Sequence, residues 1–182
     1  MTRRILIALL CVFAFSQHAA AQTRATVVIL VRHAEKAALP ADDPPLSAAG
    51  NARALALAEA LKSANVTAAI VTPLTRTQET ARPLATLRNI NLEVVPLGQA
   101  NIHAKAVADA VRAHAGQTVL VVGHSNTIGA IIFALGGPPM ADICDSQYSN
   151  LYTLILDGSS VRLLHSTFGA PSPDPATTCP AH

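Results

Sequence analysis

The sequence contains one stretch, TVVILVRHA at residues 26–34, that bears most directly on the fold. Its first six residues are apolar or β-branched without alternation, and the run stops at Arg32 and His33. A short unbroken run of this kind is typical of a strand that is buried on both faces of a sheet. We therefore expect a central strand with two polar side chains at its carboxyl end.

Strand-like and helical segments alternate along the rest of the chain. Helices of ten or more residues between strands indicate crossover connections, and therefore a mainly parallel α/β sheet with helices on both faces. The expected strands are 26–31, 67–71, 92–95 and 118–122, with a hairpin of 151–156 and 161–165 around Asp157-Gly158. The expected helices are 47–63 after a Ser47 cap, 74–87 with a kink or break at Pro83, 103–115, and 127–135.

The first 21 residues have the layout of a secretory signal peptide. Arg3-Arg4 precedes an apolar run at 5–15, and Ala19-Ala20-Ala21 supplies small residues at the cleavage spacing. The run is shorter than the roughly 20 apolar residues of a transmembrane helix. We expect an exported protein, periplasmic or secreted, with no stable membrane insertion after cleavage. The expected boundaries are 1–21 for the signal peptide, 22–167 for one folded domain, and 168–182 for a loose C-terminal tail.

Charge and cysteine content limit the possible partners. The 13 Lys and Arg residues include Arg3-Arg4, so the remainder equal the 11 Asp and Glu residues in number. This balance gives no general attraction to polyanions, and we expect no nucleic-acid partner. Outside the leader the cysteines are Cys144 and Cys179, and the sequence leaves open whether they form a disulfide.

Polar residues follow three of the expected strands directly. They are Arg32-His33, the segment from Thr72 to Arg76, and His124-Ser125-Asn126. In open α/β sheets, ligands sit beyond the carboxyl ends of the strands, so these segments should meet at one edge. Two arginines and two histidines gathered there would repel one another unless an anion lay among them. A phosphate dianion fits, because arginine bonds phosphate oxygens bidentately and a protonated histidine adds a charged donor.

His33 is the candidate nucleophile of this site. Neighbouring positive charge lowers the pKa of a histidine, which keeps one ring nitrogen unprotonated. Covalent catalysis then splits hydrolysis into phosphoryl transfer to His33 and attack by water on the phosphohistidine. This chemistry requires no metal and no cofactor. The other histidines (103, 114, 165 and 182) lack the spacing of zinc ligands, and we expect His103 and His114 on a helix surface.

Four segments in order resemble the histidine phosphatase, or phosphoglycerate mutase-like, superfamily. They are VRHAEK at 31–36, PPLSAAG at 44–50, TPLTRTQETA at 72–81 and VVGHSNT at 121–127. The resemblance covers about residues 26–165 and is to a short member. It implies a three-layer sandwich with a mainly parallel mixed sheet, and a phosphatase that hydrolyses a phosphomonoester of a small molecule or a phosphoprotein. It also implies that His33 is the phosphorylated residue and that Arg32, Arg76 and His124 hold the phosphoryl group.

The chain departs from the pattern of that superfamily in two places. Ala34 replaces the usual glycine after the nucleophile, which is a small change. No acid occurs in residues 96–101, where one branch carries a glutamate, and Ser125 stands where the other branch carries its acid. General acid catalysis is worth about 10²–10⁴-fold, so the identity of the proton donor matters. The sequence leaves four candidates, Glu35, Asp42, Asp43 and Glu93.

Two alternative functions remain open on the sequence alone. A phosphate-binding member of the same fold without turnover would keep the cationic pocket and explain the missing acid. A serine hydrolase using Ser125 is suggested by Gly123-His124-Ser125 after a strand, with Asp157 and His165 as later triad partners. The physiological substrate is not encoded in these motifs, because specificity would come from the loops at 37–45, 96–103 and 138–150.

Overall fold

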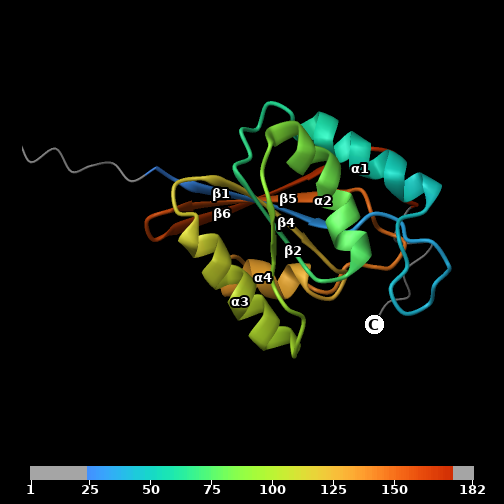
Figure 1. Cartoon of the computed structure of the whole chain (residues 1–182). Coiled ribbons are helices and arrows are strands. Elements are labelled where there is room, and N and C mark those ends of the chain that lie inside the picture. The colour runs from blue at the N-terminus through green and yellow to red at the C-terminus, as the bar shows by residue number, and fades with distance from the viewer. Residues whose placement is uncertain (1–23, 174–182) are drawn as a thin grey trace, which may run out of the picture.

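The computed structural model describes residues 24–173, in which strands and helices alternate up to α4 and two further strands follow (Figure 1). The expected signal peptide and Cys179 lie outside the described residues. No helix within residues 24–173 is both long and apolar enough to cross a membrane. The elements are β1 (Thr26–Arg32), α1 (Ala48–Leu61), β2 (Ala68–Val71), α2 (Thr75–Arg88), β3 (Leu92–Val94), α3 (Ala100–Ala113), β4 (Thr118–Gly123), α4 (Ile128–Ala134), β5 (Asn150–Asp157) and β6 (Ser160–Thr167).

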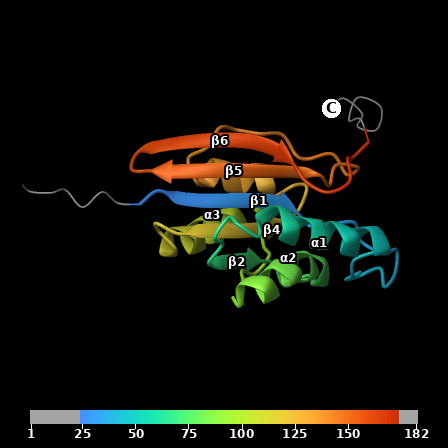
Figure 2. The same ribbon diagram turned by 90° about the horizontal axis from the view of Figure 1, so that it is seen from above.

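The strands form one mixed sheet in the order β3-β2-β4-β1-β5-β6 (Figure 2). The strands β3, β2, β4 and β1 are parallel to one another, whereas β5 runs antiparallel to both β1 and β6. Near its carboxyl end β1 has Val31 beside Val122 of β4 on one side and Leu151 of β5 on the other. The predicted fold class is confirmed. Because β5 is reversed, the loop that enters it lies at the carboxyl end of β1.

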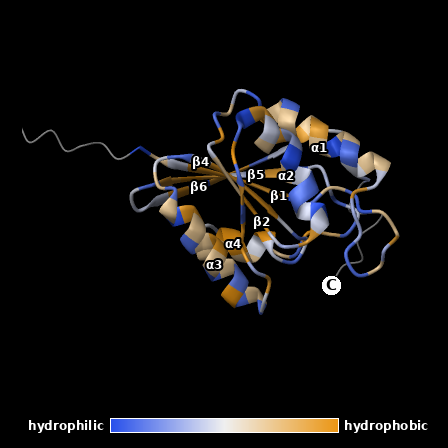
Figure 3. Cartoon of the chain, in the orientation of Figure 1, coloured by the Kyte–Doolittle hydropathy of each residue, from blue (hydrophilic) through white to orange (hydrophobic). Residues whose placement is uncertain are grey.

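The helices cover the two faces of the sheet in pairs (Figure 1). Val28 and Leu30 of β1 pack in one core cluster with α3 and α4. Ile29 and Val31 point the other way, into a second cluster with α1 and α2. Figure 3 shows the apolar strands enclosed between these helices. Burial on both faces explains the unbroken apolar run of β1, since each fully buried aliphatic side chain stabilises the fold by about 1.5–3 kcal/mol.

Three expectations about the elements need correction. α2 continues through Pro83 without a break, and its buried face includes Ala81 and Leu84 on either side of the proline. α3 begins at Ala100, earlier than the expected residue 103. Residues 168–173 are not a loose tail: Phe168 is buried in the cluster under α1, and its N–H donates to the Ser149 carbonyl at 2.9 Å. One aromatic ring therefore anchors a segment whose Pro, Thr and Ala content suggested no packing.

Candidate active site

His33 is buried directly after β1 and is fixed by its neighbours. Its backbone N–H donates to the Gly123 carbonyl at 2.9 Å, which continues the pairing of β1 with β4. Its Nδ1 lies 2.8 Å from the Ala34 carbonyl oxygen. Because a carbonyl only accepts, Nδ1 carries the hydrogen and Nε2 holds the lone pair. The next backbone N–H, that of Ala34, donates to Thr80 Oγ1 of α2 at 2.9 Å.

The surroundings of His33 keep its imidazole neutral. Burial lowers its pKa from 6.5 to about 3, the hydrogen bond to Ala34 opposes this, and the positive charge of Arg32 acts in the same direction as burial. His124 and Arg76 lower the pKa further. Nearby charge was the expected cause of the shift, but burial is the larger one. Nε2 is thus available as a base or nucleophile throughout the neutral and mildly acidic range.

His124 follows β4 and faces His33 across the site. Its backbone N–H donates to Thr127 Oγ1 at 2.9 Å, and its Nε2 lies 3.1 Å from Thr72 Oγ1 after β2. The two imidazole rings are 5.3 Å apart between centroids, in an edge-to-face arrangement. Burial first, and then the charge of Arg76, lowers the pKa of His124 to about 4. The carboxyl ends of β1, β2 and β4 therefore meet here, as expected for the ligand site of an open α/β sheet.

Arg32 points into the loop between α4 and β5. Its Nη1 donates to the carbonyl oxygens of Cys144 and Asp145 at 3.1 and 2.9 Å. Its Nη2 donates to Asp145 Oδ1 at 3.1 Å and to the Tyr148 hydroxyl at 3.4 Å. The guanidinium also stacks over the Tyr148 ring, 4.2 Å from its centroid. The loop thus positions Arg32 with several contacts, while Nε is buried with no hydrogen-bond partner among the described residues.

Arg76 comes from the first turn of α2. Its Nη1 lies 3.8 Å from Asp43 Oδ1, and its Nε is buried with no partner among residues 24–173. The same Asp43 accepts hydrogen bonds from the backbone N–H and the hydroxyl of Thr75, at 3.0 and 2.7 Å, so it caps the start of α2. Buried N–H donors are seldom left unpaired in folded proteins. The free Nε donors of Arg32 and Arg76 are suited to an anion.

The four predicted site residues line one cavity of about 440 Å³ at the carboxyl end of β1. It holds three cationic side chains and one carboxylate, so its formal charge of about +2 with neutral histidines matches a phosphate dianion. A larger cavity of about 690 Å³ lies at the other end of β1, near Thr26, and contains none of these residues. The lining of the 440 Å³ cavity comprises Arg32, His33, Lys36, Arg76, His124, Ser125, Asn126, Asp145 and Tyr148.

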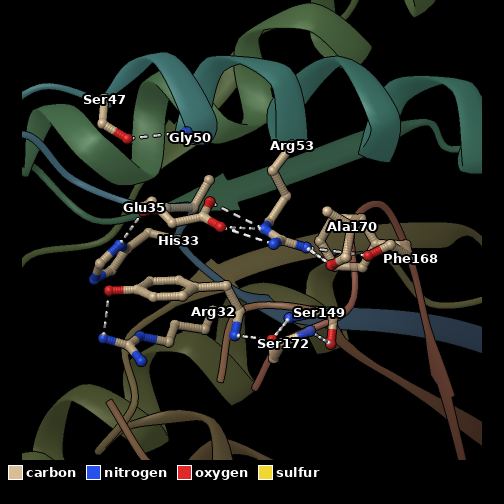
Figure 4. Close-up of polar contacts among 12 residues, drawn as sticks. Arg32, His33, Glu35, Ser47, Gly50, Arg53, Ser149, Phe168, Ala170 and Ser172 are labelled. Atoms are coloured by element: carbon tan, nitrogen blue, oxygen red, sulfur yellow. Dashed lines mark hydrogen bonds and ion pairs between the residues drawn. The ribbon is translucent and has the colours of Figure 1, made fainter. Parts of the chain in front are cut away.

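Glu35, a candidate proton donor, is engaged elsewhere (Figure 4). Its carboxylate points toward Arg53 of α1 and accepts hydrogen bonds from Nε and Nη2 at 2.7–3.0 Å. Burial opposes ionisation, but the hydrogen bonds from Arg53 outweigh it and hold the pKa of Glu35 below its usual value. Arg53 also donates from Nη1 to the carbonyl oxygens of Phe168 and Ala170. Glu35 is therefore an ionised anchor for the loop after His33.

The remaining candidate acids lie outside the cavity lining. Asp43 is engaged with Thr75 and Arg76, and Asp42 is exposed in the same loop. Glu93 on β3 bonds Nε2 of His114 at 2.9 Å. The carboxylate that does reach the cavity is Asp145, which was not among the sequence candidates. Lys36 and Tyr148 were missed as well.

Two histidines outside the site, His103 and His165, differ from what the sequence suggested for them. His103 is buried, not on the helix surface, and its Nδ1 donates to the Pro96 carbonyl at 2.9 Å. His165 bonds Asn150 Oδ1 at 2.9 Å through Nε2 and stacks on Tyr152. Asp157 ends β5 beside the amino-terminal end of β1, away from the site, because Leu156 pairs with Thr26. Ser125 therefore has neither expected triad partner beside it.

Comparison with known proteins agrees with this fold. Residues 28–97 match the model of the histidine phosphatase superfamily (branch 1). No curated protein matches the chain. The structure of the protein histidine phosphatase SixA complexed with tungstate is similar, with 21% identity, a TM-score of 0.63, and coverage of 78% of this chain and 96% of that one.

Two further solved structures share the fold. The mycobacterial glucosyl-3-phosphoglycerate phosphatase is 17% identical, with a TM-score of 0.61 over 81% of this chain and 100% of that one. Phosphoserine phosphatase from Entamoeba histolytica is 16% identical, with a TM-score of 0.57 over 80% and 97%. Identities this low establish the fold only. The segment that holds His33 and Arg76 thus matches the histidine phosphatase superfamily, and the chain shares its fold with phosphatases of known structure.

Proposed function

We propose that the protein is a phosphatase that hydrolyses a phosphomonoester through a phosphohistidine on His33. One observation carries the proposal. Nδ1 of His33 donates its hydrogen to the Ala34 carbonyl, so Nε2 is the unprotonated ring nitrogen. The side chain that carries this nitrogen lines a cationic cavity. The match of residues 28–97 to the superfamily model, and phosphatases that share the fold, support the reaction class.

In the first step, Nε2 attacks phosphorus, the N–P bond forms, and the bond from phosphorus to the ester oxygen breaks. In the second step, water attacks the phosphohistidine, the N–P bond breaks, and inorganic phosphate leaves. Arg32, Arg76 and His124 hold the phosphoryl oxygens and stabilise the charge that develops on them. Positioning and charge stabilisation are the main contributions a protein makes to phosphoryl transfer.

The positions of the buried groups suit these roles. Thr72 holds His124 at Nε2, and Thr80 holds the backbone N–H after His33, so the side chains that surround the phosphoryl group are fixed before substrate arrives. Fixed dipoles and charges need no reorganisation during reaction. The small, polar cavity favours a compact hydrophilic phosphomonoester, or a phosphorylated side chain on a protein.

Turnover of an aryl phosphate and trapping of the phosphoenzyme test the proposal. We expect wild type to release phosphate and, after denaturation in alkali, to retain label on His33 that acid then removes, as a phosphoramidate requires. His33→Ala should lose both signals, whereas His165→Ala, a histidine on the edge strand β6, should keep both. Phosphate binding without turnover would identify a non-catalytic binding protein. Activity that survives His33→Ala but not Ser125→Ala would identify a serine hydrolase.

A further inference from the structure

The loop between α4 and β5 brings a carboxylate to the catalytic cavity. Asp145 is the one Asp or Glu among the residues that line it, and its side chain is 89% exposed toward solvent. Only its Oδ1 is engaged within the described part of the chain, by Nη2 of Arg32 at 3.1 Å. Arg32 and His33 line the same cavity, so this contact holds Asp145 within the cavity of the nucleophile.

Phosphoryl transfer from an alcohol or sugar needs a proton for the leaving oxygen. Without it an alkoxide would be expelled, and a positioned general acid is worth about 10²–10⁴-fold. Three of the acids considered so far are committed elsewhere: Glu35 to Arg53, Asp43 to the start of α2, and Glu93 to His114. The fourth, Asp42, is exposed and does not line the cavity. Before substrate binds, His33 and His124 are neutral at pH 7, because burial lowers the pKa of each well below 6.5. His33 is in addition the group that attacks phosphorus.

We propose that Asp145 is the proton donor for the leaving oxygen in phosphoryl transfer to His33. The proposal rests on the proposed function and adds the class of substrate, which is a phosphomonoester of an alcohol or sugar with a strongly basic leaving group. Oδ2 is the oxygen of Asp145 that carries the proton, because Oδ1 stays with Arg32.

Asp145 and a bound phosphate share one guanidinium. A phosphate dianion that binds to Arg32 and Arg76 occupies the cavity that Asp145 also lines. Arg32 then serves both partners, holding the phosphoryl group and orienting Asp145. An exposed side chain on a loop also obtains its proton from solvent directly.

The proton balance closes over the two steps. As the bond from Nε2 to phosphorus forms and the ester bond breaks, the proton on Oδ2 moves to the leaving oxygen and the neutral alcohol departs. Asp145 is then a carboxylate. It accepts a proton from the attacking water as the new bond from oxygen to phosphorus forms and the N–P bond breaks, which restores the acid and the unprotonated Nε2.

The alternative is that Asp145 only occupies Arg32 when phosphate is absent. As an internal anion it would compete with phosphate for the same guanidinium, and its removal would strengthen binding. The two roles predict opposite effects of Asp145→Asn. This substitution keeps the shape and a hydrogen-bond acceptor for Arg32, but it removes both the charge and the acidic proton.

The test compares two substrates in Asp145→Asn and in Asp142→Asn, a matched control on the same loop whose exposed side chain does not line the cavity. With an alkyl phosphate, we expect kcat/KM of Asp145→Asn to fall by about 10²–10⁴-fold. With p-nitrophenyl phosphate, whose leaving group needs no proton, the fall should stay below about tenfold. Asp142→Asn should match wild type with both substrates.

The pH profile provides a second readout. Wild type should lose kcat/KM for the alkyl phosphate as rising pH removes the proton of the acid, and Asp145→Asn should lack this limb. Equal losses on both substrates would overturn the proposal, since they would indicate only a misplaced Arg32. Unchanged or improved kcat/KM, with tighter inorganic phosphate binding, would overturn it in favour of the internal competitor. Failure of wild type to turn over p-nitrophenyl phosphate would instead refute the proposed function.

Discussion

Replacement of Arg53 by methionine should destabilise the protein and loosen the loop that carries His33. Arg53 is 5% exposed and joins three parts of the chain, since it bonds the carboxylate of Glu35 and the carbonyl oxygens of Phe168 and Ala170 (Figure 4). Methionine retains much of the apolar stem but donates no hydrogen bond. Glu35 would then remain as a poorly solvated carboxylate without a cation.

The size of the effect follows from the burial of the pair. Removing one partner of a fully buried ion pair costs about 3–5 kcal/mol. Glu35 is 24% exposed, so water recovers part of that loss. The two carbonyl oxygens lose their donors as well, at about 1 kcal/mol each. We expect Arg53→Met to lower the free energy of unfolding by about 3–4 kcal/mol.

Urea unfolding of a double-mutant cycle measures this value. Glu35→Met combined with Arg53→Met removes both charges, so the double variant should be more stable than the sum of the single losses by about 2 kcal/mol. Aryl phosphate turnover should fall in Arg53→Met through kcat, because the loop after His33 is less ordered. A single loss below about 1 kcal/mol, or strictly additive losses, would refute the assignment of Arg53 as the anchor of this loop.

Three further effects should be measurable. Gly50→Ala should cost about 1–3 kcal/mol in urea unfolding, because its Cβ would clash with the backbone oxygen of Glu35. Gly98→Ala meets no atom within 4 Å and should unfold like wild type. Thr80→Val leaves the buried N–H after His33 unpaired and should cost about 1–3 kcal/mol, with faster amide exchange at that site; unchanged exchange would contradict the contact. The free energy of unfolding should fall as pH drops from 6.5 toward 4, because His33 and His124 stay neutral in the folded state while the unfolded chain takes up protons. The double variant with glutamine at both histidines should show a flatter pH profile, and an unaltered slope would contradict the lowered pKa values.

Much of the site could be predicted because it depends on local signals. The unbroken apolar run of β1 identifies a central strand, and Arg32 and His33 stand directly at its end. Arg76 and His124 also follow strands, and parallel strands bring their carboxyl ends to one edge whatever their order in the sheet. The rule needs no knowledge of which strands are neighbours, so it succeeds from sequence alone.

Asp145 and Tyr148 could not be predicted from the sequence, because their place depends on long-range strand pairing. Their loop reaches the cavity only because β5 pairs antiparallel with β1, and a hairpin in the sequence does not specify which strand it joins, or in which direction.

The burial of His103 did leave a signal in the sequence. His103, Val107 and Val111 follow at helical spacing, so the histidine shares the apolar face of α3. Phe168 likewise stood out as an aromatic residue directly after β6.

The position of β1 has a consequence for how the protein is made. It is the first strand in the chain, yet both of its neighbours come late, since Val31 lies between Val122 and Leu151. Until β4 and β5 have been made, this apolar strand has two open edges, and unpaired apolar edges are prone to association. Such long-range pairing slows folding, and the cavity that His33 lines requires both pairings of β1.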